Sequence, residues 1–271
     1  MPPKTLKTTD QKQKPGFSEY PDFFARFYDL IYHQMRDGVD NRFYLDRIGE
    51  TKGRILEIGS GTGRLLTEAL SEGADIYGID ISPAMLGVLR SKISIEQQAR
   101  ISLQNMISFR FGHKFDLIIA PFRVFMHLTD KSDQLKALEH VFKNLNPGGR
   151  FIFDAFIPNL QMLLTGLDNV KDFEGEYEPG KSVKRIVSTW PDLLNQIINM
   201  TFTIEWHDGR KEYKKAWNSS LHYFFRFELE HLIERSPFSS YSILGDFEGN
   251  ELNADSMEFV AICRKSQGGR K

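Results

Sequence analysis

The apolar residues in the first half of the chain gather in short runs that end at turns or polar residues. Residues 55–58 and 77–80 form two such runs, and residues 115–122 form a third that is nearly continuous. A continuous apolar run is typical of a strand that is buried on both faces of a parallel sheet. Residues 134–145 instead repeat their apolar positions every three or four residues, which indicates an amphipathic helix. This half of the chain therefore predicts a parallel sheet with helices packed against it.

The second half shows a different pattern, because its apolar and polar residues alternate. Residues 198–206 alternate strictly, as in a strand with one buried face. The turn at residues 207–210, His-Asp-Gly-Arg, contains the Asp-Gly pair that strongly signals a hairpin, and residues 213–223 continue the alternation. Together with residues 183–190, these segments predict three antiparallel strands inserted after the strand that begins at residue 150.

The last segment returns to helix and strand. Residues 225–235 predict a helix that ends at Ser236-Pro237, and residues 239–245 and 258–264 predict two further strands. The single cysteine, Cys263, lies in the last of these strands, where we interpret it as a small apolar filler and not as a nucleophile. One cysteine allows no internal disulfide, which fits a reducing compartment.

The clearest candidate chemistry lies in residues 55–66, which run Ile-Leu-Glu-Ile-Gly-Ser-Gly-Thr-Gly-Arg-Leu-Leu. Gly59, Gly61 and Gly63 lack a Cβ atom, so the backbone there can turn sharply and approach a ligand closely. The helix that follows presents unpaired N–H groups to such a ligand. Asp80 ends the next strand, at a position where an acid can bind ribose hydroxyls. This stretch therefore predicts a binding site for a nucleotide-type cofactor.

Two classes of cofactor compete for this loop. The dinucleotide fingerprint is G-x-G-x-x-G/A, but the third glycine here stands one position early. Glu57 is also unusual for a dinucleotide fold, because a carboxylate inside an apolar strand is costly unless it is hydrogen-bonded. Both departures disfavour an NAD-dependent oxidoreductase.

Both departures match another family. Residues 57–63, Glu-Ile-Gly-Ser-Gly-Thr-Gly, resemble the first motif of class I S-adenosylmethionine-dependent methyltransferases. Residues 79–86 resemble the second motif, with Ser82 as a helix N-cap, and residues 145–151, Leu-Asn-Pro-Gly-Gly-Arg-Phe, resemble another recurrent feature. The resemblance covers about residues 52–160. It implies an α/β fold with a doubly wound, mostly parallel seven-stranded sheet and an antiparallel last strand, to which the three-stranded antiparallel sheet is added.

The resemblance also implies a cofactor, S-adenosyl-L-methionine, with S-adenosyl-L-homocysteine as its product. In the family the glycine loop passes under the methionine half of the cofactor, and the strand-end acid holds the ribose. Ile81 and Met85 would cover one face of the adenine, and Asn105 keeps an acceptor oxygen for the adenine amino group. The residues expected to bind the cofactor are Tyr20, Tyr28, Glu57, Gly59, Gly61, Thr62, Gly63, Asp80, Ile81, Met85, Asn105, Met106, Ala120 and Phe122.

Tyr20 and Tyr28 belong to an aromatic segment, residues 17–50, that predicts a helical cap. Most of its aromatic side chains are expected to pack on the core. The family adds a second role, because its N-terminal helices lie over the cofactor and a tyrosine or arginine often touches the methionine carboxylate. The candidates for that contact are Tyr20, Tyr28, Tyr32 and Arg42.

Three residues near the strand ends are candidates for catalysis. If the reaction uses a base, His127 is the first candidate, because it follows the fourth strand and the ordinary pKa of a histidine suits a general base. A histidine whose ring is satisfied by the backbone is the alternative. Arg123 could bind an acidic group of the substrate or pair with a local carboxylate. Asp154 could hydrogen-bond an acceptor or cap the segment that follows it. A neutral amine can attack a sulfonium methyl directly, so an amine acceptor requires no base.

The chain is expected to divide into a disordered tail (1–16), a helical cap (17–50), a methyltransferase core (51–165 and 225–265) and an inserted antiparallel sheet (170–224). The tail carries four lysines and one acid and no aromatic residue. The resemblance implies that the inserted sheet acts as a lid over the acceptor site or as the contact of a homodimer, and a structural sheet with no direct role is the open alternative.

Composition narrows the alternatives only slightly. With 41% hydrophobic and 26% charged residues, the 271-residue chain resembles an ordinary soluble protein. Its formal net charge of −1 argues against a nucleic-acid surface spread over the whole protein. The N-terminal residues lack the apolar core of a signal peptide, and no apolar run approaches membrane-spanning length, so a cytoplasmic location is expected. The spacing of the histidines suggests no metal site.

We therefore expect methyl transfer from S-adenosylmethionine to an oxygen or nitrogen atom of a small-molecule acceptor. Two alternatives stay open at this point. The same fold serves nucleic-acid and protein methyltransferases, although the Asn/Asp-Pro-Pro-aromatic motif of amino-methylating nucleic-acid enzymes is replaced here by residues 120–123, Ala-Pro-Phe-Arg. The chain could also bind the cofactor without catalysing a reaction.

Overall fold

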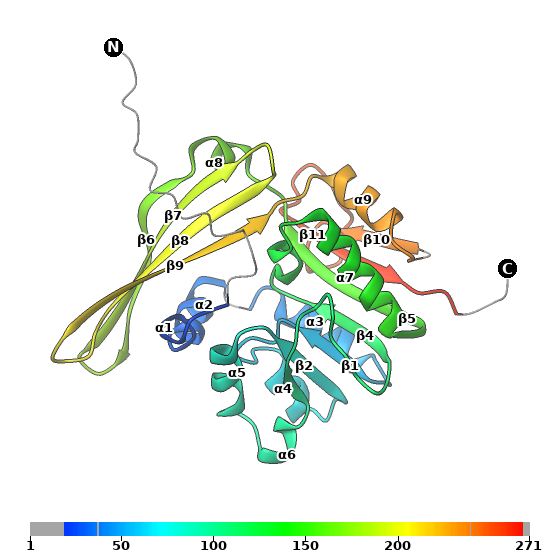
Figure 1. Ribbon diagram of the computed structural model, residues 1–271, viewed down its shortest axis with the longest axis horizontal. Coiled ribbons are helices and arrows are strands. Elements are labelled where there is room, and N and C mark those ends of the chain that lie inside the picture. Colours follow the sequence, from blue (N-terminus) through cyan, green and yellow to red (C-terminus); the bar gives the residue numbers. More distant parts are fainter. Residues whose placement is uncertain (1–18, 37, 239, 268–271) are drawn as a thin grey trace, which may run out of the picture.

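The computed structural model describes residues 19–36, 38–238 and 240–267, and it contains two β-sheets with helices around and between them (Figure 1). The tail expected at residues 1–16 lies outside the described residues. The larger sheet, sheet A, has seven strands in the order β10-β11-β5-β4-β1-β2-β3. Its strands are β1 (Ile55–Ile58), β2 (Ile76–Asp80), β3 (Ile101–Leu103), β4 (Phe115–Ala120), β5 (Leu145–Phe156), β10 (Ser240–Leu244) and β11 (Glu258–Arg264).

Sheet A confirms the predicted α/β fold with an antiparallel last strand. Strands β1 to β5 pair in parallel, whereas β11 runs antiparallel to both of its neighbours, β5 and β10. The strand order turns back between β1 and β4, so a crevice forms beyond the carboxyl ends of these two strands. This is the position at which open α/β sheets bind their ligands.

Both faces of sheet A are covered by helices, as the continuous apolar runs predict. Along β5, Phe151 and Phe153 pack into one core cluster with α7 and α9, while Ile152 packs into a second cluster with α3, α4 and α5. This split follows from the two-residue period of a strand. The helices are α3 (Asn41–Gly49), α4 (Leu66–Ser71), α5 (Pro83–Arg90), α6 (Ile95–Gln98), α7 (Lys131–Asn144), α9 (Arg226–Glu234) and the 3₁₀ helix η1 (Val124–His127).

The inserted sheet, sheet B, has four antiparallel strands, so the expected number of three is corrected to four. Its strands are β6 (Leu167–Glu178), β7 (Lys181–Asp192), β8 (Ile197–His207) and β9 (Glu212–His222). The additional strand is β6, which pairs only with β7 and forms one edge of the sheet. Most of its side chains are exposed and Phe173 is its buried apolar residue, so the alternation that marks β8 is absent from it.

Two short helices, α1 (Asp22–Ala25) and α2 (Tyr28–Arg36), lie between sheet B and the rest of the molecule (Figure 1). Phe24, Phe27 and Ile31 pack against the inner face of sheet B in a third apolar cluster. Trp217 of β9 contributes to this cluster, and its ring centroid lies 4.4 Å from that of Tyr20. Sheet B therefore reaches the crevice of sheet A through α1 and α2. The helix α8 (Leu160–Thr165) connects the two sheets.

Candidate active site

A cavity occupies the crevice at the carboxyl ends of β1, β2 and β4. Its floor is the glycine loop after β1, its sides are the ends of β2 and β4, and α2 with the segment before α1 contributes its roof. The residues that line it are Tyr20, Tyr28, Glu57, Ile58, Gly59, Ser60, Gly61, Thr62, Arg64, Asp80, Ile81, Met85, Gln104, Met106, Pro121, Phe122, Val124 and His127.

The glycine loop has the backbone that its sequence predicts. Gly59, Gly61 and Gly63 all have positive φ angles, of 71°, 54° and 89°, a region that favours glycine over other residues. A Cβ atom on Gly59 would also lie 2.3 Å from the side chain of Val124. The loop and the first residue of η1 can therefore touch only because residue 59 is glycine.

Asp80 stands at the end of β2 with its carboxylate at the cavity. Its Oδ2 accepts a hydrogen bond from the Gly61 N–H at 2.9 Å, and its Oδ1 accepts one from the Ser82 N–H at 2.8 Å. Burial raises the pKa of Asp80, and these backbone donors oppose that rise. Ser82 caps α5 by accepting from the Met85 N–H, as predicted. This carboxylate ties the glycine loop to the start of α5.

Glu57 is the unusual acid of the site. Its side chain is 3% exposed, and burial raises its pKa to about 8, although the nearby Arg64 guanidinium opposes the rise. Within the described part of the chain, its Oε2 atom has no hydrogen-bond partner. A buried acceptor without a partner is costly, so this atom is suited to a donor or cation of a bound ligand.

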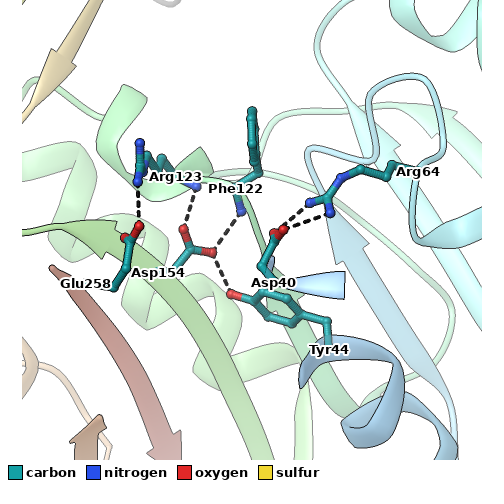
Figure 2. A network of polar contacts seen from close by, with 7 residues as sticks. All are labelled: Asp40, Tyr44, Arg64, Phe122, Arg123, Asp154 and Glu258. Carbon is teal, nitrogen blue, oxygen red and sulfur yellow. Dashed lines mark hydrogen bonds and ion pairs between the residues drawn. The ribbon is translucent and has the colours of Figure 1, made fainter. Parts of the chain in front are cut away.

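Arg64 lines the cavity, although the sequence did not lead us to expect it there. Its guanidinium binds both oxygens of Asp40, at 2.8 and 2.6 Å, and Asp40 is fully buried just before α3 (Figure 2). The pair joins the glycine loop to the N-terminal segment. The sequence did contain an indication that Arg64 belongs to the site, because an arginine directly after the third glycine must lie near the ligand. Its ion-pair partner Asp40 could not be predicted in the same way, because it is 24 residues away.

Hydrogen bonds and an ion pair connect the roof of the cavity, formed by α2 and the segment before α1, to its walls. The Ser82 hydroxyl donates to the backbone oxygen of Tyr20 at 2.7 Å. The Thr62 hydroxyl donates to Asp29 of α2 at 2.6 Å, and Lys92 pairs with the same carboxylate at 2.6 Å. Burial raises the pKa of Tyr20 and of Tyr28, so both hydroxyl groups stay protonated and can donate hydrogen bonds.

His127 faces the cavity from the end of η1. Its ring centroid lies 6.2 Å from that of Tyr20. The side chain is open toward the cavity and enclosed by protein elsewhere, and this burial lowers its pKa to about 4. The imidazole is therefore neutral at physiological pH, although it is a much weaker base than an ordinary histidine.

Several residues expected at the site lie outside the cavity lining. Asn105 accepts a hydrogen bond from the Ile107 N–H through Oδ1, while its neighbour Gln104 lines the cavity. Arg123 pairs with Glu258 at 2.6 Å, the local-carboxylate alternative considered for it. The other expected residues outside the lining are Gly63, Ala120 and Asp154, together with the alternative candidates Tyr32 and Arg42.

Comparison with known proteins agrees with this geometry. Residues 55–149 match the family model described as a methyltransferase domain. These residues contain the glycine loop, Asp80 and His127, that is, most of the cavity. Residues 55–149 therefore form a methyltransferase domain, and the comparisons together support a class I S-adenosylmethionine-dependent methyltransferase with a Rossmann-like core.

Relatives of this methyltransferase include proteins that match half of the chain and proteins that match nearly all of it. The Bacillus subtilis protein YqeM, named as a methyltransferase, is 32% identical over 134 residues, which are 49% of this chain and 53% of that protein. The chain thus matches about half the length of that relative. The glycine/sarcosine N-methyltransferase of Parasynechococcus marenigrum is 28% identical over 96% of this chain and 88% of its own length.

The fold of this methyltransferase is also found among solved structures. The sugar N-methyltransferase KedS8 from Streptoalloteichus sp. superposes with a TM-score of 0.71 at 16% sequence identity, covering 98% of this chain and 100% of that protein. The likeness therefore extends beyond residues 55–149 to the inserted sheet. At this level of identity it establishes the fold alone.

The residues of the cavity fit S-adenosylmethionine, the cofactor of the family. Glu57 offers an unpartnered buried carboxyl oxygen, and the positive charge of the methionine half would lower its raised pKa and so favour the carboxylate form. Asp80 and Gly61 would hold the ribose side, and Ile81 and Met85 provide apolar contact for the adenine. Among the described residues no cluster of His, Cys, Asp and Glu could hold a metal ion, and no helix is long and apolar enough to cross a membrane.

Proposed function

We propose that this methyltransferase methylates the amine nitrogen of a small-molecule acceptor. The observation that carries the proposal is the position of His127, a neutral imidazole that lines the cavity with its ring centroid 6.2 Å from that of Tyr20. Bound S-adenosylmethionine supplies an activated methyl group. A neutral amine needs no base before it attacks, whereas a hydroxyl group must lose its proton.

The residues around His127 suit an amine in two ways. A neutral imidazole nitrogen can accept a hydrogen bond from an amine N–H and so orient the nitrogen lone pair. The aromatic rings of Tyr20, Tyr28 and Phe122 surround the same space and favour a cationic methylated product through their π faces. Alignment of donor and acceptor and exclusion of water are then the main contributions of the protein.

The relatives support a small acceptor. The N-methyltransferase that aligns over 96% of this chain is named for glycine and sarcosine, and KedS8 is named for a sugar. Both names specify nitrogen as the methylated atom. The alignment with the first of these proteins covers 96% of this chain and so extends beyond the cofactor-binding half into sheet B.

The test begins with calorimetric titration of the purified chain with S-adenosylmethionine, S-adenosylhomocysteine and NAD. We expect binding of the first two and no binding of NAD. A screen with labelled methyl donor then compares small amines with their hydroxyl counterparts. Transfer to hydroxyl compounds alone would reject the nitrogen assignment, and binding without any transfer would favour a non-catalytic cofactor-binding protein.

We further propose that a second copy of the chain docks at the end of sheet B. Exposed apolar side chains lie there on the β7–β8 hairpin and on α8, which contacts β7. Figure 1 shows α8 beside this end of sheet B. An apolar surface of this kind commonly marks a protein interface, and the net charge of −1 opposes association of two copies only weakly. The residues are Leu160, Met162, Leu164, Trp190, Leu193 and Leu194.

A further inference from the structure

Asp154 is a buried carboxylate that lies beside the cavity without lining it. It stands near the end of β5, its exposed fraction is 0%, and hydrogen-bond donors from two other segments surround it. The Tyr44 hydroxyl donates to it at 2.6 Å, and the backbone N–H groups of Phe122 and Arg123 donate at 2.8 and 3.0 Å (Figure 2). Buried carboxylates are held in this way when their charge organises the surrounding backbone.

The two backbone donors belong to a strained turn. Phe122 and Arg123 have φ angles of 59° and 66°, in the left-handed region that non-glycine residues rarely adopt. Such a conformation persists only where the surroundings enforce it. Both N–H groups donate to the same carboxylate, so Asp154 is one of the groups that hold this turn.

The turn places Phe122 at the cavity. The Phe122 ring packs edge-on against Tyr32 with a centroid distance of 5.2 Å, and the Arg64 guanidinium lies 5.3 Å from the ring centroid. Directly after the turn, Val124 rests against the glycine loop at Gly59. A change in the turn would therefore move the wall of the cavity that the cofactor faces.

The remaining contacts connect the turn to the rest of the site (Figure 2). Arg123 is anchored on its other side by the ion pair with Glu258 of β11. Tyr44 lies on α3, and Asp40, which immediately precedes that helix, holds Arg64. The Arg64 guanidinium in turn lies over the Phe122 ring, so these contacts form a continuous network along one side of the cavity.

We propose that Asp154 is a positioning residue, which holds the turn at Phe122 and Arg123 so that the Phe122 ring closes the cofactor cavity. It acts through Phe122 and not by contact with the acceptor, because its oxygens are occupied by Tyr44 and the turn. The proposal rests on cofactor binding by the proposed function, and it is independent of which acceptor is methylated.

The experiment measures S-adenosylhomocysteine affinity in the full chain carrying Asp154→Asn. The amide nitrogen cannot accept a hydrogen bond, so a backbone donor of the turn loses its partner, and we expect affinity to fall about tenfold or more. Asp116→Asn is the matched control, since Asp116 accepts from the Arg54 N–H at the opposite end of β4. The control should bind as the wild type does.

A second variant keeps the proposal testable if Asp154→Asn does not fold. Phe122→Ala leaves the carboxylate and its donors in place and should weaken binding by a similar factor. In the double variant the two losses should not multiply, because Asp154 acts through the ring that has been removed. A fluorophenylalanine at position 122 should show a shifted or broadened fluorine resonance in the folded Asp154→Asn protein.

Three results would overturn the proposal: wild-type affinity in Phe122→Ala, wild-type affinity in folded Asp154→Asn, or losses that multiply in the double variant. An unchanged fluorine resonance in Asp154→Asn would also do so. If the wild-type chain itself fails to bind S-adenosylhomocysteine, the proposed function falls together with this inference. Wild-type binding with unaffected variants rejects the inference alone.

Discussion

Three buried carboxyl groups near the cavity differ in role because their neighbours differ. Asp80 binds two backbone N–H groups of the cofactor-binding segments, whereas Asp154 binds those of a strained turn. Glu57 keeps an unpartnered oxygen and has a pKa raised to about 8 by burial. The position of Asp80 beside the glycine loop was predictable because it follows from a strand end and a local spacing. The surroundings of Asp154 were not, since Tyr44 is 110 residues away.

The first prediction at this scale concerns Asp80. Asp80→Ala should weaken S-adenosylhomocysteine binding by ~1.5–3 kcal/mol, because a charge-assisted hydrogen bond to the ribose is lost. Calorimetry on the folded variant measures this change. Asp75→Ala, which removes a half-exposed acid just before the same strand, should leave the affinity unchanged. Equal affinities in the wild type and Asp80→Ala would refute the ribose assignment.

The second prediction concerns His127 and pH. The pKa of about 4 in the folded protein lies below the ordinary value of 6.5, so the unfolded chain binds a proton that the folded chain does not. Stability should therefore fall as pH decreases from about 6.5 toward 4, and His127→Gln should lose less stability over that range. Thermal unfolding of both proteins at several pH values measures the difference, and identical pH dependence would exclude a buried neutral His127.

His127 also makes a prediction for turnover. Since its imidazole is neutral above about pH 5, titration of His127 should cause no change in the turnover number near pH 6.5. His127→Gln should lower turnover while leaving S-adenosylhomocysteine affinity nearly unchanged. A change in wild-type turnover near pH 6.5 that is absent from the variant would instead establish His127 as a general base of ordinary pKa.

At the scale of elements, periodicity identified those strands that have a strong apolar pattern. The alternation of apolar and polar residues in β8 and β9 was sufficient to predict them as strands. Each of them has one face that packs on α1 and α2 or on the main core. β6 was missed because it is an edge strand with mostly exposed side chains, and its place in the sheet depends on pairing with β7. Pairing between strands is a long-range property that residue pattern alone does not encode.

At the scale of the whole molecule, the inserted sheet and the N-terminal helices form one unit above the cofactor cavity. Sheet B packs on α1 and α2. α2 contacts the walls through Thr62 and Lys92, and the segment before α1 contacts them through Ser82. The expectation of a lid over the acceptor side is compatible with this arrangement and stays a prediction. The same sheet presents apolar side chains at its far end, where we propose that a second copy docks.

The association of two copies is the prediction at this scale. Light scattering coupled to gel filtration should give a mass about twice the 31.3 kDa of the chain. Leu193→Asp should shift this mass toward the monomer, because a charge would be buried in the interface. Leu103→Asp is a matched control, since both leucines are 53% exposed but Leu103 lies on β3 of sheet A. A monomeric wild type, or equal dissociation by both variants, would reject this interface.

The sequence alone determined the glycine loop, the acid at the end of β2, the strands with strong patterns and the family that they resemble. These features depend on neighbours a few residues apart, through backbone conformation and side-chain periodicity. Only the tertiary structure decided that Arg64 is held by Asp40, that His127 is neutral, and that Asp154 supports the turn at Phe122. These features depend on burial and on partners from distant segments, and both arise only when the chain has folded.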